Sequence, residues 1–256
     1  MNTTFNFNRL GLLLKRYITE NIQREITFWG IAILVFALVR NDETVRFFLY
    51  ITGFIFAANQ FKIFAYTPGG MHYLLIPATH TEKLTASILL STVYYFIMFM
   101  ITYVIGNSLG TVVGNLIFGL NNPIDLSIFS IDANINGVPE SLQHFVKNSI
   151  FKTFGTFAFI QSIFLLGSVY FKRNAVGKTM LAIALFGAIL IAIEILFVKI
   201  SFGTYSIATN NLYLSYYDFN QSTTLNVLSK TFEIGSYLVV PFLWIVSYFR
   251  LTEKEV

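Results

Sequence analysis

Long apolar stretches, separated by shorter polar ones, dominate the pattern of this chain. Six of them approach or exceed the ~20 residues that a helix needs to cross a bilayer. They lie at about 25–40, 46–66, 83–106, 149–171, 179–198 and 231–249. Backbone groups in lipid must pair within their own segment, and these stretches lack the alternation of barrel strands. The pattern therefore predicts an all-α integral membrane protein with six transmembrane helices.

A different periodicity precedes the first span. Over residues 8–23, apolar side chains recur at helical spacing on one face, and charged or polar side chains occupy the rest. This predicts an amphipathic helix within residues 1–24 that lies on the membrane surface, where its basic residues suit an anionic leaflet. The alternative is a cytosolic helix that packs on a partner subunit.

The remaining segments complete the predicted organisation. Residues 25–249 would form the six-span domain, with outer loops at about 107–148 and 199–230, and residues 250–256 would form a tail. The apolar run after the third span continues to residue 120 and contains Gly106, Gly110, Gly114 and Gly119. Three interpretations of residues 109–120 are open, namely a helix extension, a re-entrant piece and an interfacial segment.

Composition agrees with a membrane body. The chain is 55% hydrophobic and only 12% charged, about half the charge of an ordinary soluble domain, and it contains 28 Phe. It has no Cys, which excludes disulfides, thiol catalysis and thiolate metal sites. We interpret the net charge of +4 as a signal of membrane topology, with the lipid bilayer and no nucleic acid as partner.

The basic residues choose the orientation, because they concentrate on the cytosolic side of membrane proteins. With the amino terminus inside, ten Lys and Arg fall on inner segments (Arg9, Lys15, Arg16, Arg24, Lys83, Lys172, Arg173, Lys178, Arg250 and Lys254). Five fall on outer segments (Arg40, Arg46, Lys147, Lys199 and Lys230). We therefore expect both termini, and the loop between spans two and three, to be cytosolic.

One short basic turn could be mistaken for a nucleotide site. Val176-Gly177-Lys178-Thr179 resembles the end of a phosphate-binding loop, but the full pattern needs Gly at position 172, where this chain has Lys. No strand is predicted before it. We interpret Lys172, Arg173 and Lys178 as topology anchors.

Two further patterns resemble a catalytic motif and a metal site, but each lacks other features that such a site requires. Gly106-Asn107-Ser108-Leu109-Gly110 matches a serine-hydrolase motif, but that motif requires a strand-to-helix turn and here ends a predicted membrane helix. His72 and His80 share one loop with only Glu82 as a further ligand, and we interpret both as polar loop residues. We therefore expect no catalytic residue, metal site or cofactor.

The polar segment before the third span carries a helix-start signal. Thr79 and Glu82 have the spacing of a capping box, in which each side chain pairs with the backbone N–H of the other residue. Pro77 prevents the preceding segment from continuing as a helix. These residues predict an ordered corner between spans two and three.

The same corner resembles a known family. Residues 74–84, reading LLIPATHTEKL, are similar to the L-L-x-L-P-[VA]-[ST]-x-x-E segment of ABC-2-type permeases, the membrane subunits of ABC exporters of the second membrane type. That family has an amphipathic elbow helix followed by six spans, with both termini inside, which matches the predicted plan along the whole chain. The chain differs from the family in having His80 and Thr81 where a basic residue is common, and in having no family signature in its outer loops.

The resemblance implies a permease subunit of an ATP-driven exporter in the bacterial cytoplasmic membrane. Such a subunit has no ATPase activity of its own, pairs with a second permease subunit, identical or different, and docks on a separate cytosolic ABC ATPase. The loop between spans two and three would couple the two proteins. Its contact residues would be Gly70, Met71, His72, Tyr73, Leu74, Leu75 and Ile76, with Pro77, Thr79 and Glu82 fixing their angle to the third span.

Two other functions fit the same predicted body. One is a membrane accessory or regulatory protein without a translocation path, and the other is an intramembrane enzyme. No charged cavity or repeated motif in the sequence specifies a transported substrate or a direction of transport.

Overall fold

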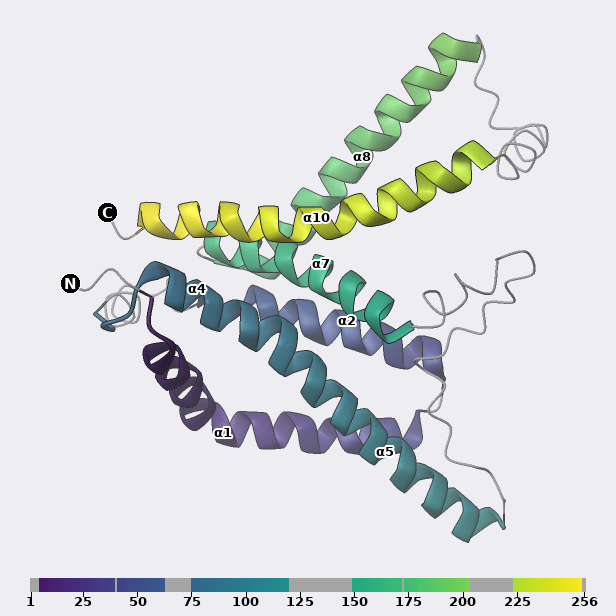
Figure 1. Cartoon of the computed structure of the whole chain (residues 1–256). Coiled ribbons are helices and arrows are strands. Elements are labelled where there is room, and N and C mark those ends of the chain that lie inside the picture. Colours follow the sequence, from purple (N-terminus) through teal and green to yellow (C-terminus); the bar gives the residue numbers. More distant parts are fainter. Residues whose placement is uncertain are drawn as a thin grey trace.

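The structure is a computed structural model that describes residues 5–39, 41–62, 75–119, 149–171, 173–202 and 223–254. Every regular element in these ranges is helical (Figure 1). The elements are α1 (Phe7–Leu38), α2 (Asp42–Ala58), α4 (His80–Ile88), the π-helix η2 (Leu89–Tyr94), α5 (Tyr95–Phe118), α7 (Ser149–Tyr170), α8 (Ala175–Phe202) and α10 (Thr223–Lys254). The predicted all-α class is confirmed for this part of the chain.

Four helical segments among the described residues are long and apolar enough to cross a bilayer. They are Phe7–Leu38, His80–Ile117, Thr153–Tyr170 and Ala175–Ile193, and they identify an integral membrane protein. Helices α2 and α10 lie where the second and sixth spans were expected, but neither is one of these four. The six-span arrangement therefore stays a prediction.

The predicted surface helix and the first span form one continuous helix, α1. Figure 1 shows the first part of α1 turned away from the rest. Three side chains near this change of direction donate to carbonyl oxygens four residues earlier, at 2.9–3.0 Å (Thr19 to Lys15, Asn21 to Tyr17 and Thr27 to Gln23). Such bonds to the preceding turn often bend helices. The membrane-surface position of residues 8–23 stays a prediction.

Helix α2 ends earlier than the second span was expected to end. It finishes at Ala58 instead of residue 66, and turn bonds follow at Asn59 and Gln60. The Asn59 side-chain amide donates to the Ile55 carbonyl oxygen at 2.8 Å. Asn disfavours helix interiors because its side chain competes for backbone hydrogen bonds, whereas the apolar residues just beyond it suggested that the span continued.

The third span is the longest uninterrupted helical run in the described structure. Helices α4, η2 and α5 follow one another without a break from His80 to Phe118, and Gly119 ends the run with a positive φ of 64°. Of the three interpretations of residues 109–120, the helix extension is correct as far as residue 118. The π-helical turn within this run is of a kind that is often found at functional sites.

An aromatic core joins α1, α2, α5 and α7. Its buried members include Trp29, Phe36, Tyr95, Phe99 and Phe157. Ring centroids lie 5.2 Å apart for Trp29 and Tyr95, and 5.1 Å apart for Phe36 and Phe99, within the range of favourable aromatic pairs. Aromatic side chains therefore fill much of the interior where these four helices meet.

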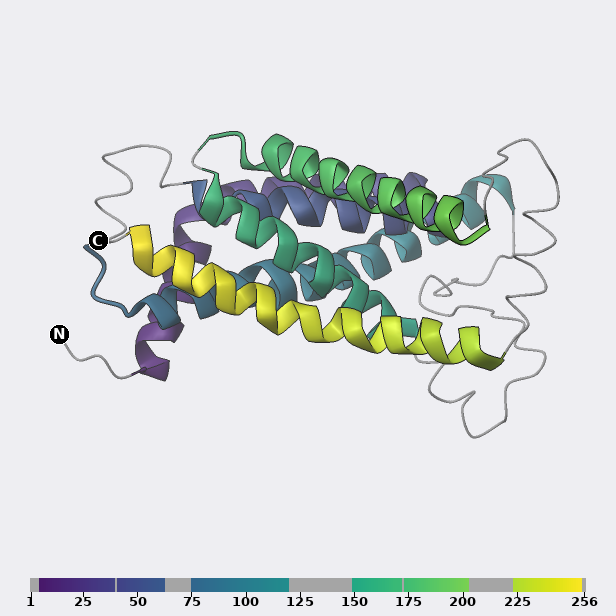
Figure 2. The same ribbon diagram turned by 90° about the horizontal axis from the view of Figure 1, so that it is seen from above.

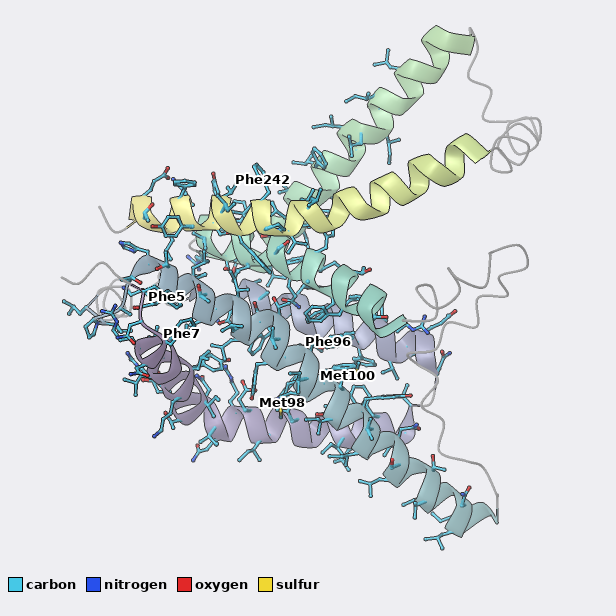
Figure 3. All side chains as sticks on the ribbon, in the orientation of Figure 1. Phe5, Phe7, Phe96, Met98, Met100 and Phe242 are labelled. Carbon is cyan, nitrogen blue, oxygen red and sulfur yellow. The ribbon has the colours of Figure 1, made fainter. Side chains whose placement is uncertain are left out.

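The outer helices differ in how closely they pack. Helix α7 contacts α2, α8 and α10, whereas α8 diverges from the bundle in Figure 1 and is mostly exposed. Figure 3 shows Phe242 on the outer side of α10, with Phe96 inside the bundle. Exposed apolar side chains on α8 and α10 suit a lipid environment.

Both views place the start of α1, the start of α4 and the end of α10 at one end of the bundle (Figure 2). At this end Leu84 of α4 packs with Leu251 of α10 and with Val169 of α7. The corner before α4 therefore lies beside the end of the last helix.

Candidate functional site at the corner before the third span

The predicted capping box is present. Thr79 is the N-cap of α4, and its Oγ1 accepts a hydrogen bond from the Glu82 backbone N–H at 3.2 Å. In return, Glu82 Oε2 accepts from the Thr79 backbone N–H at 2.8 Å. Two backbone donors that a helix start leaves unpaired are thereby satisfied.

Glu82 also contacts the beginning of α1. Its Oε1 accepts from the Asn6 backbone N–H at 2.7 Å and lies 2.9 Å from Nη2 of Arg9. Asn6 is itself the N-cap of α1, with its Oδ1 accepting from the Asn8 N–H at 2.8 Å. One carboxylate therefore joins the N-caps of two helices that are 76 residues apart in sequence.

The Glu82 carboxylate needs these contacts because it is buried. The Glu82 side chain is 0% exposed and that of Arg9 is 29% exposed. A buried carboxylate is costly unless charges or hydrogen-bond donors surround it, and here two backbone N–H groups and a guanidinium do so. The positive ends of the α1 and α4 dipoles favour the same negative charge. The corner is thus a polar junction whose parts depend on one another.

The residues before Pro77 form the described part of the expected contact segment. Leu75 is 79% exposed, and the Ala78 N–H donates to the Ile76 carbonyl oxygen at 2.7 Å in a turn. Gly70, Met71, His72, Tyr73 and Leu74 lie outside the described residues. Leu75 and Ile76 therefore lie in the turn that leads into Pro77 and the start of α4.

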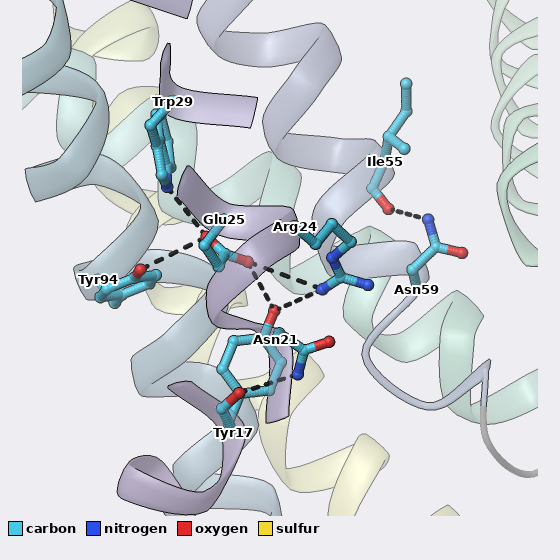
Figure 4. Close-up of polar contacts among 8 residues, drawn as sticks. All are labelled: Tyr17, Asn21, Arg24, Glu25, Trp29, Ile55, Asn59 and Tyr94. Carbon is cyan, nitrogen blue, oxygen red and sulfur yellow. Dashed lines mark hydrogen bonds and ion pairs between the residues drawn. The ribbon is translucent and has the colours of Figure 1, made fainter. Parts of the chain in front are cut away.

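A second buried carboxylate, which the sequence did not single out, lies on α1 (Figure 4). Glu25 accepts from Trp29 Nε1 at 2.9 Å, from the Tyr17 hydroxyl at 3.3 Å and from the Tyr94 hydroxyl at 3.4 Å. Arg24 lies 3.7 Å from it and donates to the Tyr17 hydroxyl at 3.1 Å. The spacing of Tyr17, Glu25 and Trp29 along one helix face was the available signal.

A cavity of about 670 Å³, lined in part by charged side chains, adjoins this network between the first half of α1 and the end of α2. Its lining includes Glu25, Arg24 and Lys62, and Ile76 of the corner. The cavity and the corner are therefore neighbours.

The basic turn between α7 and α8 has a simple structure. Asn174 adopts a positive φ of 56°, and Lys178 Nζ lies 5.8 Å from the centroid of the Phe171 ring. Arg173 is exposed, and Lys172 lies outside the described residues. The role of these residues as topology anchors stays a prediction.

The two enzyme-like patterns lack the structure that they require. Ser108 lies in the middle of α5, where Gly106 and Gly110 face the backbone of α1, so no strand-to-helix turn presents it. Gly177 and Thr179 lie in the first turns of α8. Among the residues described, no group of three His, Cys, Asp or Glu side chains could hold a metal ion.

No family model, curated protein or solved structure matches this chain.

Proposed function

We propose that this chain is the permease subunit of an ATP-driven ABC exporter, and that the corner before the third span couples it to a separate cytosolic ATPase. The proposal starts from the resemblance of residues 74–84 to that family. The observation that supports it most is the junction at Glu82, which joins α4 to α1. The second subunit would be another permease chain, and the site of action the bacterial cytoplasmic membrane.

Transmission of an ATPase movement requires a connection that does not deform. A push on the corner would act on α4 through the capping box and on α1 through Asn6 and Arg9. Because η2 and α5 continue α4 without a break, the same push would tilt the whole third span. Packed helices that move as units in this way are a common mechanism of conformational switching.

The corner also offers a surface for the partner. Leu75 is a large apolar side chain that is mostly exposed, in the short segment just before α4. Exposed apolar patches often mark protein interfaces. The predicted orientation would place this surface in the cytosol, together with both chain ends.

Affinity purification from the native membrane tests the proposal. We expect an ABC ATPase to co-purify with the tagged wild-type chain, and to be lost with Leu75→Ser. The matched control is Leu116→Ser, because Leu116 is as exposed as Leu75 but lies near the far end of α5. Absence of any ATPase from the wild-type sample, or equal recovery with Leu75→Ser, would contradict the assignment of the corner. An ATPase that binds without any change in its hydrolysis rate would favour an accessory protein.

A further inference from the structure

Two cavities share one wall. The cavity of about 670 Å³, which charged side chains line in part, and a second cavity of about 150 Å³ are both lined by Phe28, Thr52 and Tyr95. The second cavity lies between α1, α2 and α5, and its lining is almost entirely apolar (Phe28, Trp29, Ile31, Ala32, Val35, Phe36, Phe48, Thr52, Tyr95 and Phe99). The two adjoining cavities are together called the groove, with a charged end near the corner and an apolar end within the helical body.

The charged end has an excess of available positive charge. Its basic residues are Arg16, Arg24 and Lys62, and its acidic residues are Glu20 and Glu25. Arg16 pairs with Glu20 at 2.6 Å. The Glu25 carboxylate accepts hydrogen bonds from the neutral donors described above. The Arg24 side chain is 65% exposed, and its Nη2 lies 3.7 Å from Glu25 Oε1, which is too far for a hydrogen bond. The Lys62 backbone N–H donates to the Asn59 carbonyl oxygen, and the exposed Lys62 side chain makes no hydrogen bond or ion pair with any described residue.

The apolar end has few polar groups. The Thr52 hydroxyl donates to the Phe48 carbonyl oxygen, and although Thr52 lies near Tyr95, the buried Tyr95 hydroxyl makes no hydrogen bond of normal geometry. Apolar cavities of this size stay dry and bind apolar ligands. Ile31 and Phe48 on the rim are exposed, so this end opens toward the surrounding lipid. The Tyr95 hydroxyl lies where the charged and apolar ends meet.

We infer that this groove binds a single-chain anionic amphiphile of the fatty-acid class. Its carboxylate would pair with Arg24 and Lys62, and its acyl chain would run past Phe28 into the apolar cavity. Because basic residues outnumber acidic ones at the charged end, the groove favours an anionic ligand over a cationic one. A volume of about 150 Å³, well below that of ordinary drug-sized pockets, holds part of one acyl chain and not the two chains of a phospholipid, and the rest of the chain would extend past Ile31 and Phe48 into the lipid. The inference concerns this chain alone and holds whether or not an ATPase binds it.

Photocrosslinking tests the inference on the full chain in nanodiscs of zwitterionic phosphatidylcholine. The probe is palmitic acid that carries a diazirine in its chain, and labelled peptides are mapped by mass spectrometry. We expect labelling to concentrate in residues 28–36, 48–52 and 95–99. Unlabelled palmitate should compete, and hexadecanol should compete roughly tenfold less well, because it lacks the charge-assisted hydrogen bonds.

Matched variants separate the two ends of the groove. Lys62→Gln combined with Arg24→Gln should remove the preference for palmitate over hexadecanol, whereas Arg173→Gln, an exposed basic residue elsewhere, should not. Ala32→Phe should fill the apolar cavity and abolish the localised labelling. Ala184→Phe, on the exposed face of α8, should leave it unchanged. The thermal stability of each variant in detergent identifies any that fails to fold.

Three results would overturn the inference. Labelling spread evenly over exposed helices such as α8 would mean ordinary lipid contact. Equal competition by hexadecanol would remove the role of the charged end. Displacement of the probe by phosphatidylglycerol but not by palmitate would identify a site for a two-chain lipid instead.

Discussion

The packing of α5 on α1 depends on two positions that have no side chain. A Cβ atom built on Gly110 would meet the Ala37 carbonyl oxygen and lie 2.9 Å from the Ala37 Cα, and one on Gly106 would lie 2.7 Å from the Ile33 carbonyl oxygen. These neighbours are backbone atoms, which cannot rotate aside as a side chain can. The two helices pack more extensively than any other described pair, so the strain cannot be confined to one end. Small residues allow such close approach between membrane helices.

We predict that Gly110→Ala destabilises the protein relative to Gly187→Ala. Overpacking of a filled interface costs about 1–3 kcal/mol. Ala also favours a helix over Gly by about 0.8–1.0 kcal/mol, and this gain applies to both variants. Gly187 on α8 has open space around its added Cβ, so the control gains helix propensity without a clash. The difference in unfolding free energy between the variants should therefore equal the cost of the clash.

Reversible unfolding in mixed micelles of dodecylmaltoside and sodium dodecyl sulfate measures this difference. The chain has two Trp residues, and Trp29 lies in the core beside α5, so its fluorescence reports on the interface. We expect Gly110→Ala to unfold at a lower mole fraction of dodecyl sulfate than Gly187→Ala. Unfolding free energies that agree within about 0.5 kcal/mol would refute the backbone contact, since changes of that size are typical of surface positions.

Three further predictions concern the corner, the α7–α8 contact and the topology. Glu82→Gln should lower the unfolding free energy by about 1.5–3 kcal/mol, measured in the same micelles, because it removes the charge that Arg9 and two N–H groups surround. Gly167→Ala should destabilise the protein, since its Cβ would meet the Thr179 side chain, and Thr179→Ala in the same chain should restore most of the loss. Reporter fusions after Lys178 should be cytosolic and fusions after Gln221 external.

Each of these measurements has an outcome that contradicts it. Glu253→Gln is the control for Glu82, because Glu253 pairs with Arg250 at an exposed site, and equal effects at both positions would remove the special role of the corner. Additive effects of the Gly167 and Thr179 substitutions would show that the two do not touch. The reverse pattern of reporter activity would overturn the orientation and place the corner outside the cell.

Local patterns predicted the features that depend on neighbouring residues. The capping box at Thr79 and Glu82 is confirmed. It could be predicted because its two residues are only three positions apart in the sequence. Helix α7 occupies Ser149–Tyr170, close to the expected 149–171. The agreement follows because the apolar run gives way to polar residues where the helix ends. Gly106 and Gly110 lie against the backbone of α1 and permit close helix packing.

Contacts between distant segments could not be predicted in the same way. Nothing in the sequence pattern pairs Arg9 and Asn6 with Glu82, because that contact depends on how α1 and α4 meet in space. Glu25 was counted only as a charge near the first span, and its partner Tyr94 is 69 residues away. The early end of α2 was missed because apolar residues continue beyond Asn59 and Gln60, where the helix ends.

The most direct test of the coupling role is the rate of ATP hydrolysis by the co-purifying ATPase, reconstituted in vesicles with and without this chain. We predict that the wild-type chain changes the hydrolysis rate, and that Glu82→Gln still binds the ATPase but loses most of that change. Leu75→Ser should lose both binding and the change in rate. An identical rate of hydrolysis with and without the wild-type chain would contradict the proposed coupling through this corner.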